Sequence, residues 1–339
     1  MRVLITGGSG LIGRVLATSL AGNGNEVIIL SRWPERVAGL QAGVRAERWD
    51  GRTTEGWHYL ADGTDAIVNL AGENISSGRW TDERKRAILQ SRLNAGQAVV
   101  QAVKMAAIKP SVVIQASGIG YYDSCGNEEI TEETPSGHDF LARLAKDWES
   151  STASLEALGI RRAVVRTGVV LSTEGGALPR MLLPFRFFVG GRLGSGWQWF
   201  PWIHITDEVS AIRFLIENEA ASGPFNLAAP FPLTNTEFSR LLGKQLRRLS
   251  LMPKLKFALR LLFGEMATVL FNSQRAIPKR LLQLGFTDIL LVKAMGVGIA
   301  LAVLVNSTVV RALFAPATMR LLGRWNWWSP GILRRFLPQ

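Results

Sequence analysis

A glycine-rich turn at the start of the chain constrains the fold more than any other feature. The β-prone residues 3–6 lead into this turn, and the amphipathic run 14–21 follows it. Gly7, Gly10 and Gly13 have the spacing G-x-x-G-x-x-G, a variant of the dinucleotide-binding fingerprint. Such glycines let backbone amides approach a pyrophosphate, whose charge the helix N-terminus stabilises. The alternative is a strand–turn–helix unit that binds no ligand. The residues expected to contact the pyrophosphate are Gly7, Gly8, Ser9, Gly10, Leu11, Ile12 and Gly13.

The end of the second predicted strand, residues 26–30, indicates which dinucleotide is preferred. An NAD-specific site usually carries an acidic side chain here, which holds the ribose 2′-hydroxyl. This chain instead has Ser31 and Arg32, and the arginine fork suits the oxygens of a phosphate. We therefore predict NADP rather than NAD as the cofactor; the alternative is a solvated surface arginine. Asp50, the last residue of the third predicted strand 44–50, is a candidate for the adenine edge or a turn residue.

Predicted strands and helices alternate through the first half of the chain. This alternation indicates an α/β fold with a doubly wound parallel sheet, whose ligand lies beyond the carboxyl ends of the strands. Leu70, Ala71 and Gly72 end the fourth strand and should therefore pass the cofactor. The further strands are predicted at 66–70, 112–117 and 162–167, and the helices at 82–105, 140–158, 207–218 and 235–246.

Three segments are predicted. Residues 1–167 form an NADP-binding domain. Residues 168–287 form a substrate lid and a small C-terminal domain, some of whose strands return to the sheet. Residues 288–339 form an apolar helical tail.

Composition excludes several classes of site. The 339 residues include one cysteine, Cys125, which rules out an intramolecular disulfide and a cysteine-cluster metal site. The three histidines lie far apart without ligand spacing, so we expect no metal. The net charge is +12, but the basic residues are spread along the chain and no helix-turn-helix or zinc-finger signature occurs. We therefore expect no nucleic-acid partner.

Six short segments, in order along the chain, resemble one known family. Together they are similar to the epimerase-like atypical short-chain dehydrogenase/reductases, of the NAD-dependent epimerase/dehydratase type with a C-terminal domain of unknown function. The resemblance covers about residues 1–287 and implies an extended Rossmann fold and a nicotinamide dinucleotide, while it leaves the substrate open. The segments are NLAGENI at 69–75, GRWT at 78–81, GIGYY at 118–122, RTGVVL at 166–171, GSGWQW at 194–199 and WIHITD at 202–207.

The resemblance also implies a catalytic tyrosine, with a lysine four residues later and an orienting serine. No tyrosine of this chain has that lysine, and Phe140 and Leu144 stand where the helix should present the pair. Ser117 loosely matches the orienting serine. Tyr121 or Tyr122 is our candidate for the hydroxyl that donates a proton; the alternative is that both pack over the cofactor or line the pocket.

Three more residues are candidates for substrate contact: Glu73, Trp202 and His204. The alternatives are a solvated charge for Glu73, a core position for Trp202 and a hydrogen bond within the core for His204. The helix that follows His204 is expected to begin at a cap formed by Thr206 or Asp207.

The C-terminal segment differs from the rest of the chain. Residues 289–310 are almost entirely apolar, and a run of about 22 residues is long enough to cross a bilayer. The segment resembles the C-terminal end of resistance–nodulation–division transporters of the mycobacterial large membrane protein type. We predict membrane association through residues 289–328; the alternative is a buried hydrophobic helix.

The expected function is hydride transfer between NADP(H) and a small carbonyl or hydroxyl compound, with a sugar-like compound as one option. The alternative is a non-catalytic NADP(H)-sensing or scaffold protein, tethered to a membrane by its tail. Because no signal peptide precedes the first strand, we expect a cytoplasmic protein, held at the inner face of the plasma membrane if the tail inserts.

Overall fold

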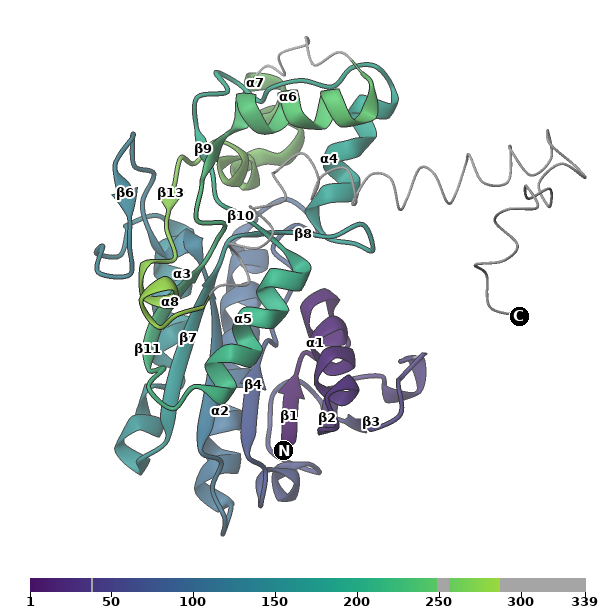
Figure 1. The fold of residues 1–339 in the computed structure, drawn as a ribbon, viewed down its shortest axis with the longest axis vertical. Helices are drawn as coiled ribbons and strands as arrows, with labels where there is room; N and C mark the ends of the chain where they lie inside the picture. Colours follow the sequence, from purple (N-terminus) through teal and green to yellow (C-terminus); the bar gives the residue numbers. More distant parts are fainter. Residues whose placement is uncertain (38, 249–255, 287–339) are drawn as a thin grey trace, which may run out of the picture.

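A seven-stranded parallel sheet forms the centre of the molecule (Figure 1). The computed structural model describes residues 1–37, 39–248 and 256–286. The strand order is β11-β7-β5-β4-β1-β2-β3, so the predicted doubly wound sheet is confirmed, with its change of direction between β1 and β4. The strands are β1 (Arg2–Thr6), β2 (Glu26–Ser31), β3 (Val44–Arg48), β4 (Ala66–Asn69), β5 (Val112–Gly118), β7 (Arg161–Thr167) and β11 (Gly223–Leu227).

Helices cover both faces of this sheet. Helices α1 (Leu11–Gly22) and α5 (Ile205–Glu217) contact each other on one face, while α2 (Asp82–Met105) and α3 (Phe140–Ser150) contact each other on the opposite face. Val3 and Ile5 of β1 belong to the core under α1 and α5, and Leu4 belongs to the core under α2. Burial on both faces explains why the inner strands β1, β2 and β4 have apolar centres.

Part of the second half of the chain, which we call the lid for its place only, lies beyond the carboxyl ends of the strands, at the top of Figure 1. Its core contains residues from α4, β8, β10 and α6. A capping box between Thr234 and Glu237 begins α6. The lid helices are α4 (Ala177–Arg186), α6 (Asn235–Leu246) and α7 (Lys256–Phe263), and α8 (Lys279–Gln283) lies against β11. The short strand pairs are β8 (Val169–Leu171) with β10 (Trp202–His204), β9 (Trp199–Phe200) with β12 (Leu233–Thr234), and β6 (Glu129–Ile130) with β13 (Arg275–Ala276). The 3₁₀ helices are η1 (Pro34–Arg36), η2 (His58–Ala61), η3 (Ile119–Tyr121), η4 (Ala153–Leu158) and η5 (Gly264–Leu270).

Two predicted helix boundaries were wrong. The helix predicted at 140–158 ends at Ser150, and η4 follows it. The Ser151 hydroxyl donates to the Trp148 carbonyl at 2.7 Å, and a Cβ added to Gly96 of α2 would collide with Ser151. The two helices therefore meet at this point, where the regular helix ends. Helix α5 begins at Ile205, and its cap is His204 rather than Thr206 or Asp207.

The predicted apolar tail, residues 288–339, lies outside the described residues. Within residues 1–37, 39–248 and 256–286, no helix is long and apolar enough to cross a membrane. Membrane association through residues 289–328 therefore stays a prediction.

Candidate functional site

The glycine turn forms a tightly packed cradle between β1 and α1. Gly7 has φ +68°, a backbone conformation that residues other than glycine rarely adopt. A Cβ added to Gly13 would lie 2.6 Å from both the Gly7 carbonyl oxygen and the Gly8 Cα, and one added to Gly8 would lie 2.5 Å from the Ile29 side chain. Gly10 caps α1 without a capping side chain. The cradle therefore fits a pyrophosphate, which would accept hydrogen bonds from the first-turn amides.

The end of β4 lies directly against this cradle, as expected for residues that pass a cofactor. A Cβ added to Gly7 would lie 2.9 Å from the Leu70 carbonyl and the Ala71 nitrogen. The Thr6 hydroxyl donates to Asn69 Oδ1 at 2.6 Å and so joins the carboxyl ends of β1 and β4. The structure thus brings together the residues predicted from two segments that are far apart in the sequence.

The end of β2 holds the residues predicted to select the dinucleotide. Ser31 is buried, and its hydroxyl oxygen accepts a hydrogen bond from the Trp33 amide at 3.2 Å. The Arg32 side chain is 65% exposed, and its Nη1 lies 3.7 Å from Glu73 Oε1. The end of β2 itself carries no acidic side chain; the guanidinium pairs with Glu73 from beyond β4, and its exposed part can still meet an anion.

Asp50 serves a turn in this structure. Its carboxylate accepts hydrogen bonds from the Arg52 and Thr53 amides at 2.7 and 2.9 Å, and from the Thr53 hydroxyl at 2.9 Å. Partial burial raises the pKa of Asp50, but the hydrogen bonds from Thr53 and Arg52 outweigh it, so the pKa lies below its ordinary value. The turn role is therefore realised, and contact with adenine stays a prediction.

A buried ion pair that the sequence did not reveal contacts the predicted catalytic residues Ser117 and Tyr121. Arg166 Nε and Nη2 donate to the two carboxylate oxygens of Glu149 at 2.8 and 3.0 Å. Ser117 Oγ donates to Glu149 Oε1 at 2.7 Å. The Arg166 guanidinium carbon also lies 3.5 Å from the centroid of the Tyr121 ring. The signal that could have revealed the pair is a charged residue, Arg166, directly after the apolar centre of its strand, residues 163–165.

The two adjacent tyrosines have different environments. Tyr122 is fully buried; its hydroxyl donates to Asn226 Oδ1 at 2.8 Å and accepts from Arg166 Nη1 at 2.8 Å. Burial raises the pKa of Tyr122 to about 12, although Arg166 opposes the rise. A hydroxyl held in this way cannot reach a substrate without rearrangement. Tyr121 is half-buried, so of the two it is the better candidate for proton transfer.

Phe140 and Leu144 belong to a hydrophobic cluster with Trp80. The Phe140 and Trp80 rings pack edge to face, with their centroids 5.0 Å apart. Lys85 of α2 lies over the Phe140 ring, with Nζ 5.3 Å from its centroid, and pairs with Glu265. The helix positions expected to carry the tyrosine–lysine pair are therefore occupied here by apolar side chains that pack in a hydrophobic cluster.

The predicted substrate contacts are not all at one place. Trp202 is buried in the lid core with Phe238 and Leu171, which argues against its predicted contact with substrate. His204 is half-buried and caps α5, with Nδ1 accepting from the Thr206 amide at 3.3 Å. Burial lowers the pKa of His204. Glu73 follows residues 70–72, which come directly after β4, and pairs with two arginines, Arg32 and Arg84.

Glu208, one turn into α5, is a fully buried carboxyl that sequence reasoning did not single out. Its Oε1 accepts from the Thr167 hydroxyl at 2.7 Å, and its Oε2 has no partner among the described residues. Burial raises its pKa from 4.5 to about 8, and the bond from Thr167 only partly offsets this. The folded protein therefore retains a proton that the unfolded chain releases above about pH 5.

Because Glu208 keeps its proton in the folded protein, we predict that stability falls as the pH rises. Because the native state binds more protons than the unfolded state between about pH 4.5 and 8, the free energy of unfolding should fall across that range. Glu208→Gln, which is neutral at every pH, should remove most of that slope. Urea unfolding at pH 5.5 and 8.5 measures the change in the free energy of unfolding with pH. An equal change in the wild type and in Glu208→Gln would contradict a buried neutral Glu208.

Comparison with known proteins identifies the family of this chain. The family model described as "NAD dependent epimerase/dehydratase family" matches residues 3–228, which contain the central sheet apart from the first residue of β1. The chain belongs to the NAD dependent epimerase/dehydratase family. A model for a domain of unknown function, DUF1731, matches residues 256–287. Epimerase family protein MW0731 of Staphylococcus aureus (strain MW2) is 37% identical over 287 residues, which cover 84% of this chain and 93% of that protein.

Solved structures of epimerase-type proteins share the fold. The human epimerase family protein SDR39U1 (isoform 2), solved with NADPH, has a TM-score of 0.78 at 34% identity, over 90% of this chain and 99% of that one. MoeE5, solved with UDP-glucuronic acid and NAD, has a TM-score of 0.65 at 17% identity over 84% of this chain and 93% of that one, a likeness of fold alone. The family matches end at residue 287, and the comparisons do not support the predicted transporter resemblance of residues 289–339.

Proposed function

We propose that this epimerase-family protein is an NADP(H)-dependent oxidoreductase or epimerase that acts on a small carbonyl or hydroxyl compound. The observation that carries the proposal is the glycine cradle beside Arg32, with no acidic side chain at the end of β2. The likeness to a human relative solved with NADPH supports it. Sugar nucleotides are one candidate substrate class, because a protein with the same fold was solved with one.

In this proposal, separate residues of the site would bind the cofactor and transfer the proton. A bound nicotinamide supplies the hydride or accepts it. The Gly7–Gly13 turn and the α1 amides would hold the pyrophosphate, and Arg32 the 2′-phosphate. Tyr121, from the loop after β5, would exchange the proton of the substrate oxygen, and Ser117 would accept a hydrogen bond while it donates to Glu149. Arg166 would position the Tyr121 ring by its cation–π contact.

A second candidate is a non-catalytic protein that senses or presents NADP(H). The apolar packing of Phe140 and Leu144, together with the buried hydroxyl of Tyr122, favours it. Both candidates require NADP(H) binding, and they differ in turnover. Oxidation of NADPH in the presence of a panel of aldehydes, ketones and sugar nucleotides would support the enzyme; cofactor binding without any turnover would support the sensor.

The first test is the cofactor preference. We expect NADPH to bind more tightly than NADH in a fluorescence titration, and Arg32→Ala to weaken NADPH binding about tenfold or more while NADH binding changes little, since a charge-assisted bond contributes about 1.5–3 kcal/mol. Arg45→Ala, an exposed arginine of β3 that pairs with Glu26 and Glu47, is the matched control and should bind both dinucleotides like the wild type. Failure of the wild type to bind either dinucleotide would overturn the proposed function.

A further inference from the structure

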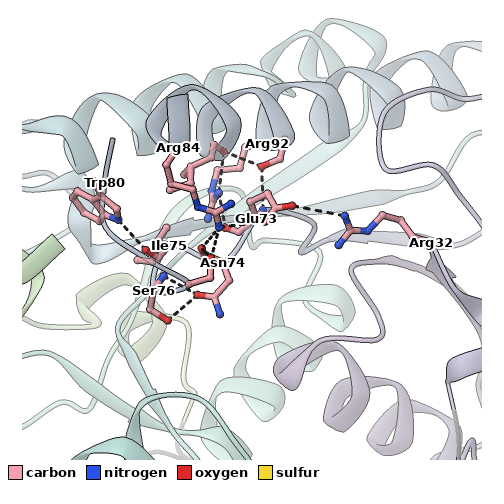
Figure 2. A network of polar contacts seen from close by, with 11 residues as sticks. Arg32, Glu73, Asn74, Ile75, Ser76, Trp80, Arg84 and Arg92 are labelled. Atoms are coloured by element: carbon pink, nitrogen blue, oxygen red, sulfur yellow. Dashed lines mark hydrogen bonds and ion pairs between the residues drawn. The ribbon is translucent and has the colours of Figure 1, made fainter. Parts of the chain in front are cut away.

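The Glu73 carboxylate lies between two guanidinium groups just after the end of β4 (Figure 2). Its Oε1 is 3.7 Å from Arg32 Nη1, and its Oε2 is 3.3 Å from Arg84 Nη2. The Glu73 side chain is 34% exposed and that of Arg32 is 65% exposed, so solvent and ligands can reach the pair from the Arg32 side. Glu73 is therefore the acid that faces the arginine proposed to bind the 2′-phosphate.

Contacts from α2 fix the backbone that carries this carboxylate. The Glu73 amide donates to Ser91 Oγ at 3.0 Å, and its carbonyl oxygen accepts from Arg92 Nη1 at 3.1 Å. Arg92 is itself buried, with its guanidinium 4.7 Å from the centroid of the Trp148 ring. These contacts fix the Glu73 backbone, so its carboxylate stays near this place, whereas the more exposed Arg32 side chain is free to turn between partners.

Arg84 provides the charge that keeps Glu73 in place when Arg32 leaves. Its Nη2 also donates to the Asn74 carbonyl at 2.7 Å and to Ser77 Oγ. The cluster thus has two arginines, Arg32 and Arg84, on the Glu73 carboxylate, while Arg92 holds the Glu73 backbone carbonyl (Figure 2). A carboxylate that loses Arg32 therefore retains one ion pair, which limits the cost of releasing it.

We propose that Glu73 is a resident counter-ion of the 2′-phosphate site, which a 2′-phosphate must displace from Arg32. The inference rests on the proposed function. A 2′-phosphate and the Glu73 carboxylate would compete for the same guanidinium donors, and the two anions would repel each other. A dinucleotide with a free 2′-hydroxyl leaves the Arg32–Glu73 pair intact. Glu73 therefore reduces the affinity for NADP(H) without changing that for NAD(H), and so sets how strongly the site discriminates between them.

The test is a double-variant cycle on the full chain. Glu73→Gln keeps the size and hydrogen-bonding capacity of the side chain but removes its charge. We expect it to tighten NADPH binding about threefold to tenfold, and to leave NADH binding unchanged, because an exposed ion pair is weak. Glu35→Gln removes a nearby exposed acid that pairs with Arg48 instead and should change neither affinity. In an Arg32→Ala background, Glu73→Gln should no longer improve NADPH binding.

The outcomes separate the two proposals. No dinucleotide binding by the wild type would overturn the proposed function. NADPH preference that depends on Arg32, together with equal or weaker NADPH binding by Glu73→Gln, would overturn the counter-ion role and leave the proposed function standing. A gain of the same size in Glu35→Gln, or one that persists without Arg32, would show a general charge effect and also overturn the role of Glu73.

Discussion

Gly13→Ala is expected to lower the affinity for NADPH by about a hundredfold or more. The new Cβ would lie 2.6 Å from the Gly7 carbonyl oxygen and the Gly8 Cα, and both are backbone atoms that no rotamer change can move. Either α1 moves away from β1 or the turn opens, and each change withdraws the first-turn amides from the pyrophosphate. Fluorescence titration with NADPH measures the loss, and circular dichroism shows whether the chain is still folded.

Gly126→Ala is the matched control. A Cβ at Gly126 meets nothing within 4 Å, and its φ is not in the left-handed range. This variant should bind NADPH like the wild type. If Gly13→Ala stays folded and binds NADPH as tightly as Gly126→Ala does, the glycine turn is not the pyrophosphate site.

The features that sequence predicted best are those encoded locally. The bounds of α2 and α6 were predicted to the residue, since a long amphipathic pattern and a capping residue mark them. The cradle followed from glycine spacing, because glycine is required wherever two backbones approach this closely. The doubly wound parallel sheet, though not its strand order, followed from the alternation of strands and helices and from the family resemblance.

The features that sequence missed depend on pairing between distant segments. Glu149 lies on α3 and Arg166 on β7, and no pattern in either element reveals that their side chains meet. Glu73 likewise reaches Arg32 only because β1 alone separates β4 from β2 in the sheet. The roles of Tyr121 and Tyr122 could not be separated from sequence either, since adjacent tyrosines look alike until burial distinguishes them. Ion pairs of this kind determine the electrostatics of the site, and they can be recognised only once the fold has brought the distant segments together.

Arg166→Met is expected to lower the free energy of unfolding by about 3–5 kcal/mol, because it removes one partner of a buried pair and leaves the other charge uncompensated. The exposed fraction is only 5% for the Arg166 side chain and 14% for that of Glu149. Arg166 also donates to the buried hydroxyl of Tyr122 and to the Glu132 carbonyl, so the change removes hydrogen bonds to three residues. The midpoint and slope of urea unfolding measure the loss.

Two further variants show whether the uncompensated charge is the cause. The double variant Arg166→Met/Glu149→Met removes both charges and should be more stable than Arg166→Met alone, since apolar groups of similar size can replace a buried pair. Lys279→Met breaks an ion pair with Glu133 that is exposed on both sides and should leave the unfolding midpoint unchanged. If Arg166→Met unfolds at the same urea concentration as Lys279→Met, the pair does not stabilise the fold. A double variant no more stable than Arg166→Met would mean that lost packing, rather than the Glu149 charge, destabilises the single variant.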